Sequence, residues 1–356
     1  MTYLIKFFQA GCGDAFHINY KGTSGTVRHM LIDGGFMLTY IAHWKKFLKD
    51  LPDEEFIDLW VITHMDTDHI NGALAHFKDK SIRPGKELIK LVWFNYFDRF
   101  NLPDNTTKIG IGSAIKLRDH LTPERCADIK QQITAEGDPV DLDGAILTVL
   151  CPDKVALEEL GNNWETLEEE FHNRPTAIKA ADDEITYPDD DLSVEELAMR
   201  PQPDEDEKDI ANRSSIAFLF EYQQISMLFL GDAHASIVIA SIRKLNEKRG
   251  CKLKVDYIKL SHHASRHNFH PELLDVVDCA DFIILSKGVS CHKLPNKETL
   301  SRILVKRKGQ GKTNFYFNYD QHRFRTMFAH ASDKEFDFEL FFPEEGQTFL
   351  KLGNEF

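Results

Sequence analysis

Short apolar runs separated by glycine-containing turns begin the chain. The runs Tyr3–Phe8, Phe16–Tyr20 and Val27–Ile32 predict three strands of a hairpin meander. A helix is predicted over Leu38–Asp50, and the apolar run Leu59–Thr63 predicts a buried strand after it.

The second half of the chain repeats this alternation. Ser215–Tyr222 and Ile225–Leu230 predict a hairpin, Ala235–Lys248 predicts a helix, and Val255–Leu260 predicts a strand. Two comparable halves built from strands and helices are typical of a layered α/β sandwich. We therefore interpret residues 1–356 as one domain.

A dense acidic stretch separates the two halves. Asp and Glu dominate positions 182–209, and only Arg200 and Lys208 oppose them. Such a stretch buries little apolar surface, so residues from about 155 to 210 are predicted to form an exposed acidic insertion. We expect it to contact a protein partner or to regulate access to the site. Residues from about 314 to 356 are expected to form a C-terminal extension.

The composition is that of an ordinary globular protein, with 42% hydrophobic and 28% charged residues. No apolar run approaches the roughly 20 residues that cross a bilayer, so we expect a soluble protein without a membrane segment. The six cysteines form no CxxC pair, which favours a reducing, cytoplasmic setting. The formal net charge of -14 argues against nucleic-acid binding only if the acids are spread evenly, and they are not.

Metal-ligand side chains are concentrated directly after the buried strand. His64, Asp66, Asp68 and His69 fall within six positions, on a turn that leads into a predicted helix. Residues two apart on such a turn can face one metal, while the adjacent Asp68 and His69 can turn toward a second. Imidazoles and carboxylates together suit Zn, Mn or Fe. The alternative is a polar surface turn, which the all-apolar strand before it disfavours.

This segment resembles the His-x-His-x-Asp-His signature of the metallo-β-lactamase superfamily. It more closely resembles the variant in the ComEC-type DNA-uptake channel, where Asp also replaces the second His. Other segments resemble family motifs in the same order, namely Gln9–Ala15, Leu31–Gly35, Asn212–Ile216, Leu228–Ala233 and Tyr257–Ser265. The resemblance implies an α/β fold with αββα layers and a metal-dependent hydrolase, here as a soluble stand-alone protein.

The resemblance also implies a centre of two divalent ions. The implied ligands are His64 and Asp66 for the first ion, Asp68, His69 and His262 for the second, and Asp232 as the bridge. A carboxylate in place of an imidazole at Asp66 makes the first site harder, which favours Mn or Mg over Zn. We expect two ions, Mn or Zn, with Mg as a further option.

Supporting roles follow from the same resemblance. Asp68 and His263 are the expected catalytic residues, with His263 in proton transfer. Asp14 and Asp33 are expected to orient the ligand loops, although turn-forming aspartates beside glycine would give the same pattern.

Two positions depart from the family pattern. Where the family supplies another His to the first site, the strand Ala145–Pro152 offers only Cys151, which we interpret as a buried core thiol. Ala264 stands where the family prefers Gly, so the loop that carries His262 is expected to differ in backbone angle.

A basic helix is predicted over Asn296–Gly309, with Asn at its N-cap. Its outer face is expected to hold Lys297, Arg302, Lys306, Arg307 and Lys308. We interpret Arg302, Lys306 and Arg307 as substrate-binding residues that receive a phosphate backbone. A solvated basic face is the alternative interpretation.

These observations predict a cytoplasmic nuclease or phosphodiesterase that acts on nucleic acid, with DNA favoured. Such a protein could serve as the effector subunit of an antiviral defence or DNA-processing assembly. The alternative is a catalytically weak scaffold that binds a partner through the acidic stretch and residues 314–356, and the incomplete first site supports it. A lactamase-like or thioester hydrolase has no positive sequence feature.

Overall fold

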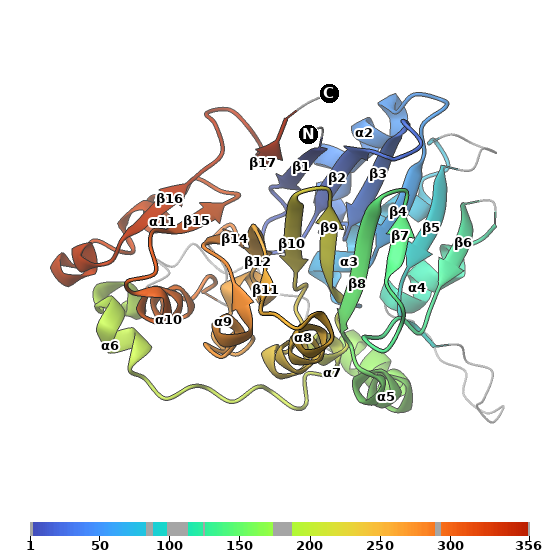
Figure 1. Ribbon diagram of the computed structural model, residues 1–356. Coiled ribbons are helices and arrows are strands. Elements are labelled where there is room, and N and C mark those ends of the chain that lie inside the picture. The colour runs from blue at the N-terminus through green and yellow to red at the C-terminus, as the bar shows by residue number, and fades with distance from the viewer. Residues whose placement is uncertain are drawn as a thin grey trace.

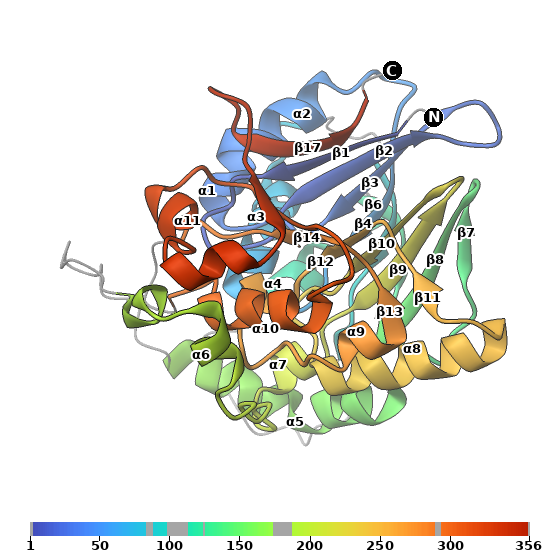
Figure 2. The same ribbon diagram turned by 60° about the vertical axis from the view of Figure 1, so that its left-hand side comes forward.

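Two mixed β-sheets lie face to face, and helices cover the outer face of each (Figure 1). The computed structural model describes residues 3–82, 88–97, 113–123, 125–173, 187–288 and 293–354, without the side chains of residues 115 and 165–173. Figure 2 shows the sheets between the helices around α2 and those around α8. The predicted fold class, an α/β sandwich with αββα layers, is confirmed. None of the described helices is long and apolar enough to span a membrane.

The first sheet has seven described strands in the order β17-β1-β2-β3-β4-β5-β6. Their bounds are β1 Tyr3–Phe8, β2 Phe16–Lys21, β3 Val27–Ile32, β4 Ile57–Val61, β5 Ile89–Trp93, β6 Cys126–Lys130 and β17 Phe349–Gly353. Strands β1 to β3 pair antiparallel as the predicted meander, whereas β3 to β6 pair parallel.

The second sheet has eight described strands in the order β16-β15-β14-β12-β10-β9-β8-β7. Their bounds are β7 Val140–Leu142, β8 Ala145–Cys151, β9 Ala217–Tyr222, β10 Ile225–Phe229, β12 Tyr257–Lys259, β14 Asp281–Ile284, β15 Thr313–Phe317 and β16 Phe338–Phe341. Its first four strands along the chain pair antiparallel and the rest parallel, as in the first sheet. Two short strands, β11 Leu253–Lys254 and β13 Val277–Asp278, form a separate ladder.

The helices fall into two groups, one for each sheet. The first group is α1 Met37–Thr39, the π-helical turn η1 Tyr40–Trp44, α2 Lys45–Asp50, α3 Thr67–Lys78, α4 Ser113–His120 and α5 Lys154–Asn173. The second group is η2 Pro188–Asp191, α6 Val194–Ala198, α8 Ala235–Arg249, α9 Leu273–Val276, α10 Lys297–Arg307, α11 His322–Thr326 and η4 Ala331–Glu335. The short turns α7 Ile210–Arg213 and η3 Ser261–Ala264 lie in loops beside strand ends.

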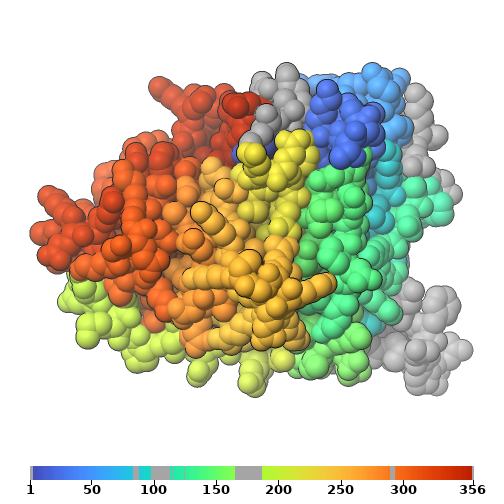
Figure 3. Space-filling view, in the orientation of Figure 1, coloured from blue at the N-terminus to red at the C-terminus, as the bar shows by residue number. Residues whose placement is uncertain are grey.

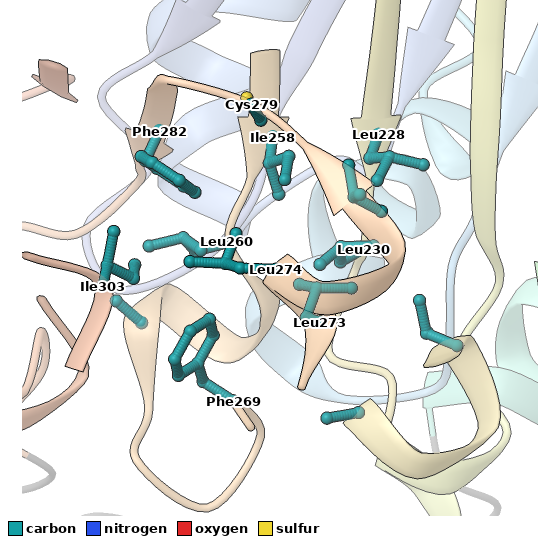
Figure 4. Close-up of a cluster of buried hydrophobic side chains, with 14 of the residues drawn as sticks. Leu228, Leu230, Ile258, Leu260, Phe269, Leu273, Leu274, Cys279, Phe282 and Ile303 are labelled. Atoms are coloured by element: carbon teal, nitrogen blue, oxygen red, sulfur yellow. The ribbon is translucent and has the colours of Figure 1, made fainter. Parts of the chain in front are cut away.

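Apolar side chains fill the spaces between the layers. Between the sheets, Phe16 stacks on Phe229 with ring centroids 5.0 Å apart, and Phe218 packs against the same ring. On the outer face of the second sheet, Ile258 of β12 and Ile303 of α10 belong to one cluster (Figure 4). Removal of this apolar surface from water, worth about 25 cal/mol per Å², holds the layers together.

The described part of the acidic stretch is not an exposed insertion. Ser193 and Glu196 form a capping box at the start of α6, and Val194 and Leu197 are fully buried against the second sheet's helices. Helix α6 lies beside α10, and the chain then runs along the lower edge to α7 (Figure 1). The space-filling view shows these yellow-green residues next to orange α10 (Figure 3). The prediction that this stretch lies outside the core is wrong for α6, because apolar residues between the acids form a buried helix face.

The upstream part of the predicted insertion also belongs to the core. Helix α5 buries Leu157, Leu160 and Trp164 in the apolar cluster outside the first sheet. Glu158 of the same helix is exposed, as expected for the polar face of an amphipathic helix.

Residues from 314 onward complete both sheets. Strands β15 and β16 extend the second sheet, and β17 pairs with β1 at the edge of the first. Leu350 and Leu352 are buried between the sheets. The predicted C-terminal extension is therefore integrated into the sandwich.

Candidate metal centre

The predicted ligands meet at one edge of the sandwich, where parallel strands of both sheets end. Strand β4 leads to His64, β10 to Asp232 and β12 to His262. A backbone hydrogen bond of 2.8 Å from Ile216 N–H to Thr63 O joins loops of the two sheets. Loops beyond the carboxyl ends of parallel strands converge, so residues distant in sequence share one site.

The segment from His64 to His69 turns from β4 into α3. Asp66 is the N-cap residue of α3, but its side chain makes no capping hydrogen bond. Its Oδ2 lies 3.7 Å from His64 Nε2. Asp68 stands in the first helical turn with its Oδ2 3.9 Å from His69 Nε2. The segment thus contributes two pairs of facing donors.

The buried Asp33 carboxylate fixes the conformation of this segment through hydrogen bonds. Its carboxylate accepts hydrogen bonds from Thr63 N–H at 2.7 Å, Thr63 Oγ1 at 2.8 Å and His69 Nδ1 at 2.8 Å. Because His69 donates from Nδ1, the lone pair of its Nε2 is available for a metal. The loop that carries Asp33 packs so tightly on α3 that a Cβ on Gly34 would lie 2.2 Å from Ala73 N. Only glycine fits there.

His262 and His263 both direct Nε2 toward the centre. His262 Nδ1 donates to Asn268 Oδ1 at 2.9 Å, and its Nε2 lies 3.8 Å from Asp232 Oδ2. His263 Nδ1 donates to Leu285 O at 2.7 Å. The structure places His263, and not His262 as predicted, with Asp68 and His69.

The reason for this difference is the backbone conformation. His262, His263 and Ala264 adopt φ values of 44°, 53° and 66° in succession. This left-handed turn places His263 Nε2 3.6 Å from Asp68 Oδ2 and His262 Nε2 3.8 Å from Asp232 Oδ2. Ala264 adopts the positive φ although Gly would do so at lower cost.

The donors form two overlapping groups. His64, His69 and Asp232 offer ligand atoms within 4.8 Å of one another, and so do Asp68, His69 and His263. His64 Nε2 lies 3.8 Å and His69 Nε2 3.3 Å from Asp232 Oδ2, and His263 Nε2 lies 3.6 Å from Asp68 Oδ2. Asp66 lies beside His64, and His262 lies beside Asp232. Atoms bound to one ion at about 2.0–2.2 Å have separations of this order.

Unpaired buried atoms show that the centre fits a metal. Within the described residues, the Nε2 atoms of His64, His69 and His263 and Oδ1 of Asp232 are buried without a hydrogen-bond partner. Each such atom costs about 1–3 kcal/mol when it is left unsatisfied. Imidazole nitrogens and carboxylate oxygens are the ligands that Zn and Mn accept. Divalent ions would satisfy the three imidazole nitrogens.

Two carboxylates of the centre, those of Asp68 and Asp232, have lowered pKa values. Burial acts to raise the pKa of Asp68, but the nearby His69 and His263 outweigh burial and hold that pKa below its usual value. Burial likewise opposes ionisation of Asp232, but the surrounding histidines lower its pKa well below the ordinary value. Metal ligands must be deprotonated, so this arrangement favours metal binding.

A buried ion pair lies beneath the bridging aspartate. Lys259, fully buried at the end of β12, pairs with Asp14 and donates to Gly231 O at 3.0 Å. Its Nζ lies 4.0 Å from Asp232 Oδ1. Asp14 Oδ1 is also 3.4 Å from His263 Nδ1, a position from which it can orient that ring. Lys259 was missed in the sequence, although a lysine inside an apolar strand directly before the histidines was a usable signal.

Three further residues position the ligands, and the sequence did not predict a role for any of them. Ser215 Oγ accepts from Asp232 N–H at 3.0 Å and lies 3.3 Å from His64 Nδ1. Asn268 donates from Nδ2 to Asp232 O at 2.9 Å while it accepts from His262. Asn212 Nδ2 lies 3.2 Å from the same His262 nitrogen. Asn212 and Ser215 belong to the segment Asn212–Ile216 that resembles a family motif, whereas Asn268 has no distinctive signal because asparagine is common in turns.

Cys151 is a core residue, as predicted. It is fully buried in the apolar cluster outside the second sheet, and its thiol donates to Arg213 O at 3.3 Å. Burial raises the pKa of this thiol well above its ordinary value, which disfavours the thiolate that a metal requires.

The predicted substrate-binding face of α10 is not a solvent-facing cationic surface. Arg302 is 7% exposed and donates to Glu298 at 2.7 Å and Arg200 O at 2.9 Å. Arg307 is 6% exposed and donates to Thr313 Oγ1 at 3.1 Å.

Of the remaining basic residues, Lys297 is fully buried, and Lys306 pairs with Asp275 at 2.7 Å. The prediction for Arg302 and Arg307 is wrong because the acidic stretch and β15 cover the helix face that local periodicity assigns to solvent.

A cavity of about 420 Å³ opens beside the centre. His262 stands at its wall together with Arg266 and His267, which follow the histidine pair. Tyr187 and Asp189 of the acidic stretch form another wall.

No family model and no curated protein matches the chain. Among solved structures, 75 chains match it. The β-hydroxylase CmlA from Streptomyces venezuelae gives a TM-score of 0.42 at 14% identity over 99% of this chain, which spans 54% of CmlA. The metallo-β-lactamase fold protein YhfI from Bacillus subtilis gives 0.42 at 8% identity over 99% of both chains. Unliganded yeast PDE1 gives 0.41 at 12% identity over 98% of this chain and 99% of PDE1. At such low similarity, function must be inferred from the site.

Proposed function

We propose that this chain is a phosphodiesterase with a centre of two divalent metal ions. The observation that carries the proposal is the convergence of imidazole and carboxylate donors around Asp232 and His69. The proposed ligands are His64, Asp66 and His262 for the first ion and Asp68, His69 and His263 for the second, with Asp232 as the bridge.

Two ions in such a centre would lower the pKa of a bound water and hold the oxygens of a phosphoryl group during hydrolysis. The residues of this chain supply the positioning. Asp33 and Leu285 O fix the tautomers of His69 and His263, and Asn268 fixes that of His262. Rigid ligands keep the geometry that in-line attack on phosphorus requires.

The donors proposed for the first ion favour a hard ion. Asp66 provides a carboxylate where an imidazole would be softer, and Asp232 adds a second carboxylate. We therefore propose Mn ahead of Zn, with Mg as a further option, because oxygen ligands suit the harder ions.

The proposed substrate is a phosphodiester of nucleic acid or of a nucleotide, with DNA favoured among polymers. The α10 arginines give no support to a polymer, since Arg302 and Arg307 are internal. The support that remains is chemical, because a centre rich in carboxylates and imidazoles with an adjacent arginine suits a phosphate ester. A cytoplasmic location and a role in a defence or DNA-processing assembly remain part of the proposal.

The scaffold alternative rests on a first site without a third ligand. We propose His262 for that position, because its Nε2 lies 3.8 Å from Asp232 Oδ2. A partner that contacts the exposed acids of the 187–209 stretch is compatible with either function.

The deciding experiment measures hydrolysis by metal-free protein that is reloaded with Mn, Zn or Mg. Labelled DNA, labelled RNA and bis(p-nitrophenyl) phosphate are the substrates, and we expect cleavage of at least one diester only with metal. Asp232→Asn should abolish it, whereas the control Asp275→Asn, which removes an exposed carboxylate paired with Lys306, should not. Full metal content without cleavage of any diester would contradict the proposal and favour the scaffold.

A further inference from the structure

The cavity beside His262 is bordered by more positive than negative charge. Arg266 is 40% exposed and lies 3.6 Å from Glu298 Oε2 and 3.9 Å from Asp189 Oδ2. Both distances exceed the range of a hydrogen bond. Glu298 already binds Arg302 at 2.7 Å, and Asp189 already binds Arg200 at 2.9 Å. Each neighbouring acid is therefore engaged by a different arginine.

The remaining acid of this wall is engaged as well. Asp190 accepts a 2.7 Å hydrogen bond from Arg323 Nε, and the Arg323 guanidinium also stacks on Tyr187 at 3.7 Å. Of the charged residues that line the cavity, Arg266, Lys293, Lys297 and Arg323 are basic, whereas Asp189 and Asp190 are acidic. Lys297 pairs with Asp333 and Arg323 with Asp190. Arg266 makes a long 3.5 Å hydrogen bond from Nε to His267 Nε2, and its nearest carboxylate oxygen is 3.6 Å away.

The guanidinium of Arg266 belongs to the same loop as His262 of the metal centre. The backbone N–H of Arg266 donates to Asn296 Oδ1 at 2.9 Å, which fixes the loop to the start of α10. The cavity of about 420 Å³ that His262 and Arg266 share is within the size range that holds one small ligand. A ligand bound at the metals would extend into it.

We propose that Arg266 binds a second anionic group of the substrate, a terminal phosphate, while the scissile diester lies at the metals. This inference rests on the proposed function and narrows its substrate to a nucleotide or strand end that carries a phosphate next to the cleaved bond. The acidic stretch then serves as the wall of this subsite, since its carboxylates at Asp189 and Asp190 are neutralised by arginines.

The test compares two substrates that differ by one phosphate. They are the p-nitrophenyl ester of thymidine 5′-monophosphate and the same ester with an added 3′-phosphate. A charge-assisted hydrogen bond should lower KM for the phosphorylated ester on the order of tenfold in the unmodified protein. Arg266→Gln should remove that advantage, so that the KM values of the two esters become equal.

A matched control is Arg243→Gln, which removes an exposed arginine of α8 that pairs with Glu272 at 2.7 Å. It should change neither KM. Calorimetric titration with thymidine 3′,5′-bisphosphate, which contains no diester, gives a readout independent of turnover. Arg266→Gln should weaken this binding about tenfold, while Arg243→Gln should not.

The outcomes separate the two proposals. If Arg266→Gln binds the bisphosphate and hydrolyses both esters as the unmodified protein does, the subsite is overturned and the phosphodiesterase stands. If neither ester is cut with any metal, but bisphosphate binding depends on Arg266, the subsite stands and the phosphodiesterase is overturned.

Discussion

Replacing Lys297 by Met tests whether the acidic stretch is part of the folded core. Lys297 and Asp333 are both fully buried, with Lys297 Nζ 3.1 Å from Asp333 Oδ2. The same ammonium donates to Leu192 O at 2.6 Å and Asp190 O at 3.3 Å. Lys297 therefore links α10 to the residues around Asp190 and Leu192, which precede α6.

The size of the effect follows from what Asp333 loses. Methionine keeps the unbranched stem of the side chain, so the variant mainly lacks the charge and its hydrogen bonds. Removal of one partner from a buried ion pair costs about 3–5 kcal/mol, because the other charge stays buried without compensation. Val194 N–H still donates to Asp333 Oδ1 at 2.8 Å, so we expect the lower end, about 3 kcal/mol. That is a large part of the roughly 5–15 kcal/mol typical of a folded protein.

Urea unfolding at pH 7 measures this loss as a change in the free energy of unfolding. The control is Lys306→Met on the same helix, where the lysine pairs with the 54% exposed Asp275. It should cost less than about 1 kcal/mol, as exposed pairs do. Adding Asp333→Leu to Lys297→Met should recover much of the stability. If Lys297→Met costs no more than Lys306→Met, the acidic stretch is not held as described.

Three other predictions concern pH and metal. Burial lowers the pKa of His76 to about 3. As the pH falls, the His76 imidazole is therefore protonated in the unfolded chain before it is protonated in the folded protein. The free energy of unfolding consequently decreases below about pH 6.5. His76→Leu should reduce the loss of unfolding free energy between pH 7 and pH 5 by about 2 kcal/mol, and an unchanged loss would contradict the shift. The Asp68→Ala protein should contain less metal by elemental analysis and should hydrolyse a diester at least about 100-fold more slowly, with its secondary structure intact. Full metal content and an unchanged rate would refute the role of Asp68 as a ligand. Asp66→His should reverse a preference for Mn over Zn in turnover, and an identical ranking of the two metals would show that ligand hardness there does not select the ion.

The local sequence pattern correctly predicted several of the strands and helices. The meander β1–β3, helix α8 and helix α10 all form as expected, since apolar periodicity and glycine turns are local signals. Strand β6 carries a mostly exposed pattern, and β17 finds β1 from the other end of the chain. Edge strands such as these are stabilised by pairing with strands that are distant in sequence. Their own residues therefore do not indicate that they form strands.

The burial of charged side chains was equally beyond local prediction. The periodicity of α10 correctly gave one buried face, but Arg302 and Lys297 stand on a second face that α6 and η2 cover. A covered basic residue and a solvated one look identical in sequence. Arg302 pairs with Glu298 of the same helix, but the segment that covers it comes from 102 positions away, as its hydrogen bond to Arg200 O illustrates.

In the metal centre, the sequence could not predict which of two adjacent histidines joins Asp68 and His69. The sequence supplied the donors around Asp232, yet it could not decide between two adjacent histidines. That choice depends on three consecutive left-handed residues that end at Ala264, each costing about 1–2 kcal/mol for a side chain larger than glycine. Contacts from elsewhere stabilise this strained turn, including His263 Nδ1 to Leu285 O and His262 to Asn268. Because this turn places His263 with Asp68 and His69, His262 is the histidine that remains for the proposed first site.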